Sequence, residues 1–222
     1  MTNTVEKHQT DDLSDGMIID FDAITLNERE DSVQMTEFTA DDGIFLNTQF
    51  TQDFRIRQTI FDMVKKAQSH LPEGYNFVIY EAYRPRARQI ELWNKAQKLL
   101  GEKYPDLSQE KLDTLAETYV ANPYNGIGSG HQSGSAIDIS LCNDDGVDFD
   151  MGTKCQEVND YTGTNAPGLS DKAVKNRTIL KDALENVGFI NYPAEWWHFS
   201  YGDMLWAHLT KNDTAFHGPL PF

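Results

Sequence analysis

Apolar residues recur along the first half of the chain at spacings that predict several helices and one strand. Residues 53–71 place them near the period of an amphipathic helix. The short apolar run 76–80 predicts a buried strand, because a glycine precedes it and an Arg-Pro pair follows it. Two further helices are predicted over 86–100, ending at Gly101, and over 108–120.

The middle of the chain changes from a glycine-rich segment to a strand. Residues 125–135 contain four glycines and three serines, which disfavours regular structure and lets the backbone approach other groups closely. Residues 136–141 alternate in polarity, which predicts a strand with isoleucine and leucine on one face and Asp138 on the other. A long loop is predicted over 142–169.

The last third of the chain has the clearest helical pattern. It covers residues 171–187, with Ser170 or Asp171 as N-cap and Val174 among the inward-facing apolar residues. An aromatic strand is predicted over 196–201. The order helix, strand, helices, strand, helix, strand predicts an α+β fold, a single domain with a central, largely antiparallel sheet flanked by helices.

Charge is distributed unevenly and bears on partners and domains. The chain has 19 Lys and Arg against 35 Asp and Glu, a formal net charge of −16. Such acidity disfavours nucleic acid and membrane surfaces as partners, and no obligate protein partner is evident. Residues 1–42 hold twelve of the acids against two basic residues, a balance of −10. We therefore expect residues 1–45 to form an acidic, partly extended or flexible segment and 46–222 to form the main domain.

The first residues of the sequence have neither a basic nor an apolar stretch typical of a secretory signal. Cytoplasmic residence is the resulting expectation, with a periplasmic location if a leader was removed. Cys142 and Cys155 are too few for a disulfide framework, which favours a packing role for both.

Three short segments concentrate polar residues that strands and glycine loops would present: 81–85, 129–138 and 195–198. Together they supply two histidines and one carboxylate, the number of protein ligands that a catalytic zinc commonly has. The three residues are His131, Asp138 and His198. Taken singly, a histidine beside tryptophans is more often a packed side chain than a ligand, so only the combination favours a metal.

Two further residues fit metal-assisted hydrolysis. Glu195 is the candidate general base, because hydrolysis needs a carboxylate near the activated water. Residues three apart in a strand point to opposite faces, so Glu195 and His198 can share a site only if Glu195 lies in the turn that Pro193 begins. Arg84, followed by Pro85, is a candidate to stabilise an oxyanion, with a surface salt bridge as the alternative.

These segments resemble the motifs of the D-alanyl-D-alanine dipeptidases, the zinc dipeptidases of the vancomycin-resistance type within the larger group of D-alanyl-D-alanine peptidases. The resemblance covers about residues 75–205. It implies a central antiparallel sheet shared with the hedgehog signalling domain. The motifs are Tyr83-Arg84-Pro85, Ser129-x-His131-x-x-Gly134-Ser135-Ala136-Ile137-Asp138 and Glu195-Trp196-Trp197-His198.

The resemblance also implies roles and a substrate. It implies one zinc ion per chain, and a substrate that is D-alanyl-D-alanine or a closely related cell-wall-derived peptide. The implied zinc ligands are His131, Asp138 and His198, the implied catalytic residues are Glu195 as base and Arg84 as transition-state clamp, and the implied substrate-binding residues are Ser129, Tyr83 and Gln156.

One departure from the family pattern concerns specificity. The family commonly continues Met-Gly-small-x-Phe-Asp, whereas this chain reads Met-Gly-Thr-Lys-Cys-Gln over 151–156. The acid expected to meet the substrate's ammonium is thus replaced by Gln156, and Glu157 is a possible substitute. Residues 1–50 also lack the family's Tyr/Thr-rich pattern.

Other interpretations stay open at this point. A carboxypeptidase or endopeptidase acting on peptidoglycan stem peptides would use the same site. A non-haem iron oxygenase would also use two histidines and a carboxylate, but usually as His-x-Asp, whereas six residues separate His131 from Asp138. A non-catalytic zinc-binding module is the third alternative.

Overall fold

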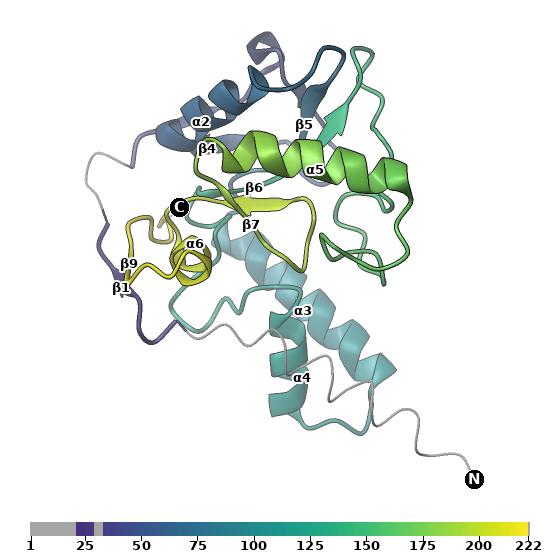
Figure 1. Ribbon diagram of the computed structural model, residues 1–222. Helices are drawn as coiled ribbons and strands as arrows, with labels where there is room; N and C mark the ends of the chain where they lie inside the picture. The colour runs from purple at the N-terminus through teal and green to yellow at the C-terminus, as the bar shows by residue number, and fades with distance from the viewer. Residues whose placement is uncertain (1–20, 29–32, 222) are drawn as a thin grey trace.

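The main sheet runs through the centre of the molecule. The computed structural model describes residues 21–28 and 33–221, and within them this sheet has five strands in the order β3-β5-β6-β8-β7 (Figure 1). The β3–β5 pair is parallel and the other pairs are antiparallel, so the predicted α+β class with a largely antiparallel sheet is confirmed. The strands are β3 (Phe45–Leu46), β5 (Asn76–Glu81), β6 (Ala136–Cys142), β7 (Ile190–Asn191) and β8 (His198–Ser200).

Two helices cover one face of this sheet and form the core with it. They are α2 (Gln58–Gln68) and α5 (Asp171–Glu185). Their buried apolar residues join Ile137, Ile139 and Leu141 of β6 in one hydrophobic cluster. Alternation along β6 turns Asp138 to the opposite face, which lies under the 143–169 loop. The sheet therefore places Asp138 on the face away from α2 and α5.

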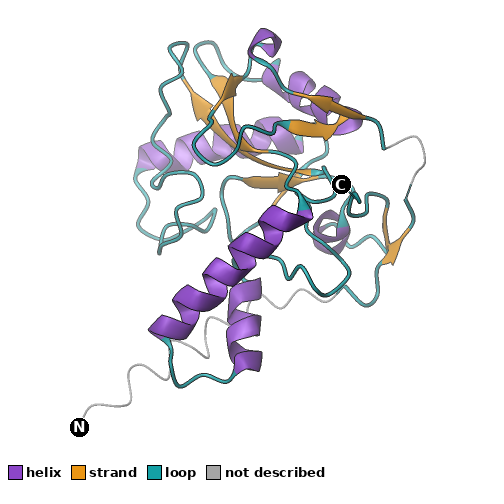
Figure 2. Cartoon of the chain, turned by 180° about the vertical axis from the view of Figure 1, so that it is seen from behind, coloured by secondary structure: helices purple, strands orange, loops and turns teal. Residues whose placement is uncertain are grey.

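The helices α3 (Arg86–Lys103) and α4 (Gln109–Glu117) form a hairpin that projects from the body of the domain (Figures 1 and 2). The prediction that Gly101 ends the first of these helices is wrong, since α3 continues to Lys103. The helix stops at Tyr104 because Pro105 disfavours helical backbone in the residue before it.

The helix predicted from residue 53 begins later than expected. Arg55–Arg57 form strand β4, which pairs antiparallel with β2 (Met35–Glu37), and α2 starts directly after it. A 3₁₀ turn, η2 (Ala40–Asp42), follows β2. The pairing partner lies about 20 residues earlier in the chain, so local periodicity could not reveal the strand.

The C-terminal part also differs in detail from its prediction. The aromatic strand is limited to β8, because Trp196 and Trp197 lie in a turn. Helix α6 (Met204–Leu209), capped by Asp203, was not predicted. Ser170 caps α5 as expected, but Val174 is 50% exposed rather than inward-facing. The inner surface of α5 near that end carries Asn176 and Arg177 instead.

The N-terminal part of the described chain pairs with the main body. Strand β1 (Thr25–Leu26) runs parallel to β9 (Thr214–Ala215), and β2 pairs with β4. Most of the acidic segment predicted over 1–45 lies in residues 1–20 and 29–32, outside the described residues, and the boundary at 45 stays a prediction. Within the described ranges, no helix has the length and apolar character needed to cross a membrane.

Arg177 organises the loop that covers the polar face of the sheet. The residue is 3% exposed, and burial lowers the pKa of its guanidinium to about 10. It donates four hydrogen bonds of 2.6–3.2 Å to loop carbonyl groups. The acceptors are the carbonyl oxygens of Met151, Tyr161, Gly163 and Thr164. One side chain of α5 thus fixes both ends of the 151–164 segment.

Replacing Arg177 with methionine is expected to lower the free energy of unfolding by about 2–4 kcal/mol, because several buried carbonyls lose their donor. Urea unfolding of both proteins measures the difference. Lys175→Met, at an exposed position of the same helix, is the control and should stay within about 0.5 kcal/mol of the original chain. Equal stability of the Arg177→Met protein and the control would contradict the structural role of Arg177.

Candidate metal centre

His131, Asp138 and His198 converge on the polar face of the sheet. Asp138 of β6 and His198 of β8 are direct partners in the antiparallel register, and the glycine-rich loop before β6 delivers His131. Asp138 Oδ1 lies 3.2 Å from His131 Nε2 and 3.1 Å from His198 Nδ1. One ligand atom from each residue lies within 4.8 Å of the others. The three residues predicted from the sequence therefore form one cluster.

Hydrogen bonds orient the ring of His131 toward the cluster. Its Nδ1 lies 2.8 Å from the carbonyl oxygen of Ala82, at the end of β5. A carbonyl accepts only, so Nδ1 carries the proton and Nε2 presents a lone pair to the centre. This is the arrangement in which a histidine can bind a metal ion through Nε2.

The residues of the cluster fit a zinc ion. All three are at least 92% buried, so the charge of Asp138 needs a cationic partner. Two imidazoles and an ionised carboxylate are the mixed nitrogen and oxygen donor set that zinc accepts, with a fourth position left open.

Glu195 lies beside the cluster, in the turn that Pro193 begins. Its backbone N–H closes this turn on the carbonyl of Tyr192 at 3.0 Å. Its Oε2 lies 4.0 Å from His198 Nδ1. In a strand the two side chains would point to opposite faces, whereas the turn lets them share one site. Burial raises the pKa of Glu195 to about 7, although His198 opposes the shift. A carboxyl group with that pKa can both take up and release a proton near neutral pH.

Arg84 is paired with a buried carboxylate and not with a surface acid. Its Nε and Nη2 donate to the two carboxylate oxygens of Glu81 at 2.8 and 2.5 Å, and its Nη1 donates to Gln89 Oε1 at 2.9 Å. Burial would lower the pKa of Arg84, but Glu81 outweighs it and keeps the guanidinium charged. Glu81 is in turn the register partner of Asp138, which brings Arg84 to the edge of the cluster.

Sequence reasoning missed Glu81 and Gln89. Glu81 ends a strand and lies two residues before the Tyr-Arg-Pro motif, so its position offered a signal. Gln89, in the first turn of α3, offered none, because a buried glutamine cannot be distinguished from a surface one by its type. Its Oε1 accepts from both Arg84 and the hydroxyl of Ser129, which lies 3.2 Å away. Ser129 thereby joins the network around Arg84.

The other two predicted substrate-binding residues differ in their surroundings. Gln156 donates from Nε2 to Asp138 and Glu81, so it contacts the cluster directly. Tyr83 is buried, with its ring 5.0 Å from the guanidinium carbon of Arg55, and its part in a substrate pocket stays a prediction.

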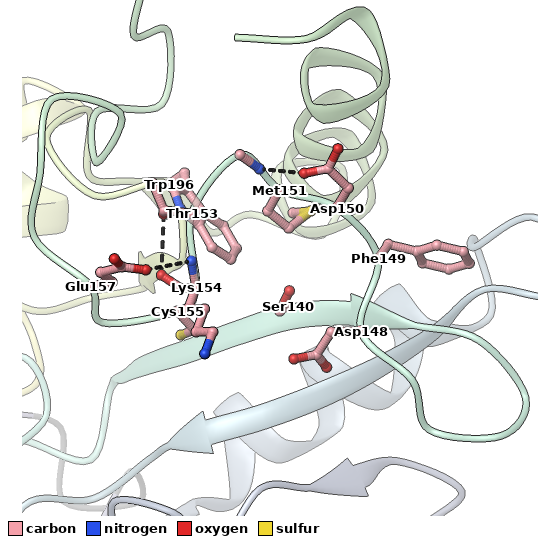
Figure 3. Close-up of a pocket in the computed structure, with 11 residues that line it drawn as sticks. Ser140, Asp148, Phe149, Asp150, Met151, Thr153, Lys154, Cys155, Glu157 and Trp196 are labelled. Atoms are coloured by element: carbon pink, nitrogen blue, oxygen red, sulfur yellow. Dashed lines mark hydrogen bonds between the residues drawn. The ribbon is translucent and has the colours of Figure 1, made fainter.

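A cavity of about 370 Å³ lies beneath the 148–157 segment (Figure 3), and none of the three cluster residues lines it. Ser140 rises into it from β6, two residues after Asp138. Cys155 and Trp196, the chain neighbours of Gln156 and Glu195, also line it. Glu157 lies at its rim, exposed, with Oε2 accepting from the backbone N–H of Lys154 at 3.2 Å. The volume of the cavity falls within the range of small-molecule sites.

An α+β domain that holds two histidines and a carboxylate beside a buried glutamate is typical of a zinc-dependent hydrolase. A sequence model of the family described as D-ala-D-ala dipeptidase matches residues 37–217. Since the match spans most of the chain, the protein belongs to this family. Membership gives no support to the two more distant interpretations, a non-haem iron oxygenase or a non-catalytic module.

Individual relatives carry the same description. The D-alanyl-D-alanine dipeptidase of Escherichia coli (strain K12) is 32% identical over 126 residues, 57% of this chain and 55% of that protein. The D-alanyl-D-alanine dipeptidase of Enterococcus faecium is 31% identical over 147 residues, 64% of this chain and 69% of that protein. The alignment with the E. coli protein thus spans little more than half of that relative's length.

Among solved structures, VanYB in complex with D-Alanine-D-Alanine is 20% identical and has a TM-score of 0.44, covering 86% of this chain and 93% of its own. The likeness at this TM-score is too distant to transfer any property of that site.

Proposed function

We propose that this protein hydrolyses the amide bond of D-alanyl-D-alanine or of closely related cell-wall-derived peptides, with Glu195 as general base. The observation that carries the proposal is the buried cluster of His131, Asp138 and His198 with Glu195 beside it. Family membership supports the substrate class.

His131, Asp138 and His198 would hold the zinc ion. The chemistry that zinc supplies when bound is Lewis acidity, which polarises a carbonyl group and makes water a stronger acid. The strand register orients Asp138 and His198, and the burial of all three ligands limits the access of bulk water.

Glu195 would move the proton. Its carboxylate takes a proton from the attacking water as the new C–O bond forms, and gives it to the nitrogen of the leaving amine as the C–N bond breaks. The pKa of about 7 supports both transfers near neutral pH. Burial of the side chain, which is 16% exposed, keeps this proton from exchanging freely with solvent.

Arg84 would stabilise the oxyanion that develops on the carbonyl oxygen. Each terminal nitrogen of its guanidinium keeps a second N–H beyond those directed at Glu81 and Gln89. The ion pair with Glu81 fixes the plane of the guanidinium, and a preorganised donor needs no rearrangement during the reaction. Ser129, bonded to the same Gln89, would help to bind the substrate next to Arg84.

A longer stem peptide is the second candidate substrate, favoured by the neutral side chain of Gln156 at a position where an acid would attract a free ammonium group. Release of D-alanine from the free dipeptide and from a stem pentapeptide, each followed with the zinc-loaded protein, distinguishes the two. A dipeptidase has the higher kcat/KM on the dipeptide, and a carboxypeptidase has it on the pentapeptide. Release of D-alanine from neither substrate would contradict the proposed function.

A further inference from the structure

The side-chain amide of Gln156 lies between two buried carboxylates. Its Nε2 is 2.6 Å from Asp138 Oδ2 and 2.9 Å from Glu81 Oε2. The carboxylate side chains are 3% and 6% exposed, respectively. Ionised carboxylates only accept hydrogen bonds, so the amide nitrogen with its two N–H groups is the atom that must lie between them.

This contact separates two like charges that the sheet brings together. Glu81 of β5 and Asp138 of β6 are register partners, and their side chains share the polar face. Arg84 balances Glu81 on one side, and the two histidines face Asp138 on the other. Between the carboxylates themselves, Gln156 gives one N–H to each, which an acid at this position could not do.

The contact also decides which oxygen of Asp138 faces the histidines. Oδ2 is engaged by Gln156, while Oδ1 lies 3.1–3.2 Å from the two histidine nitrogens. Asp138 is thereby held in a rotation that presents a single oxygen to the centre.

The backbone at Gln156 is held in an unusual conformation. Its φ is 62°, in the left-handed region that residues other than glycine and asparagine seldom adopt. Such backbone persists only where the surrounding contacts determine it, and it gathers at functional sites. The side-chain bonds of Gln156 to Glu81 and Asp138 are such contacts, and Arg177 fixes the chain on either side through the carbonyls of Met151 and Tyr161.

We propose that Gln156 is a positioning residue of the metal centre, which keeps Glu81 and Asp138 apart and holds Asp138 as a one-oxygen ligand. This inference rests on the proposed zinc site. The family commonly has an acid at this position, and the amide that replaces it here thereby has a function of its own.

Zinc affinity of the full-length apo-protein, measured by competition with a chromophoric chelator, tests the inference without using activity. Gln156→Glu keeps the length of the side chain and places the same demand on the left-handed backbone, but it replaces the amide donor with a third carboxylate. This variant should weaken zinc binding by about 10–100-fold. Gln156→Gly removes the amide while relaxing the left-handed backbone, so a loss of affinity in this variant cannot come from backbone strain.

The control is Asn159→Asp, which adds the same charge to the same loop at an exposed position. The introduced carboxylate can still accept from the backbone N–H of Tyr161, as the amide oxygen of Asn159 does, so zinc affinity should stay within about twofold of the original.

The absorption spectrum of the cobalt-loaded protein reports the ligation itself. If Asp138 turns to bind through both oxygens, the coordination number rises, and the visible bands of the Gln156→Gly protein become weaker than those of the original. Unchanged zinc affinity and an unchanged cobalt spectrum in both variants would overturn the role of Gln156 and leave the zinc site standing. Failure of the original protein to bind zinc would overturn both proposals.

Discussion

Replacing Glu195 with glutamine is expected to lower kcat by about 10²–10⁴-fold while the zinc content stays unchanged, because a positioned general base contributes a factor of this size. Glutamine keeps the shape of the side chain but cannot take a proton. Glu195 is not among the three grouped ligands, so its loss should not release the metal ion. D-Alanine release and metal analysis on the same preparation measure both effects.

Glu73→Gln is the matched control for this variant. It makes the same chemical change at an exposed acid between α2 and β5, outside the cluster and the cavity, and kcat should stay within about twofold. Turnover at the original rate by the Glu195→Gln protein would show that another group moves the proton, and the assigned mechanism would be wrong.

His131→Ala is expected to lose zinc and, with it, D-alanine release. Two ligands remain after the substitution, one fewer than the three that a catalytic zinc site usually has. Since loss of a group that merely orients a ligand costs about 10–100-fold in affinity, loss of the ligand itself should cost at least about 100-fold. Zinc retained after dialysis against a chelator gives the measurement.

His70→Ala provides the comparison for this second variant, because His70 is exposed near the end of α2 and lies outside the cluster. Its zinc content should equal that of the original protein. Full zinc occupancy in the His131→Ala protein would mean that the metal binds elsewhere in the chain.

The polar side of the site was predictable because local sequence determines it. Alternation along β6 assigns Asp138 and the apolar residues to opposite faces before any partner strand is known. The glycine-rich loop before it identifies a segment able to deliver His131. Glu195 was predicted to lie in a turn, because in a strand its side chain would point away from that of His198, and the structure places it in a turn.

The features that were not predicted depend on pairing and packing between distant segments. Strand β4 exists because β2 pairs with it. Glu81 comes opposite Asp138 only through the register of β5 and β6. The left-handed backbone and the amide contacts of Gln156 depend on a loop that Arg177 holds from another element. Amino-acid type and spacing contain none of this information.

The measurement that tests the central claim most directly is a titration of the apo-protein with zinc, in which D-alanine release from D-alanyl-D-alanine is followed at each addition. The account predicts that the rate rises with added zinc and stops rising at one equivalent per chain, since the structure groups one set of three ligands within the described residues. A rate that does not depend on zinc, or tight zinc binding without any release of D-alanine, would contradict it.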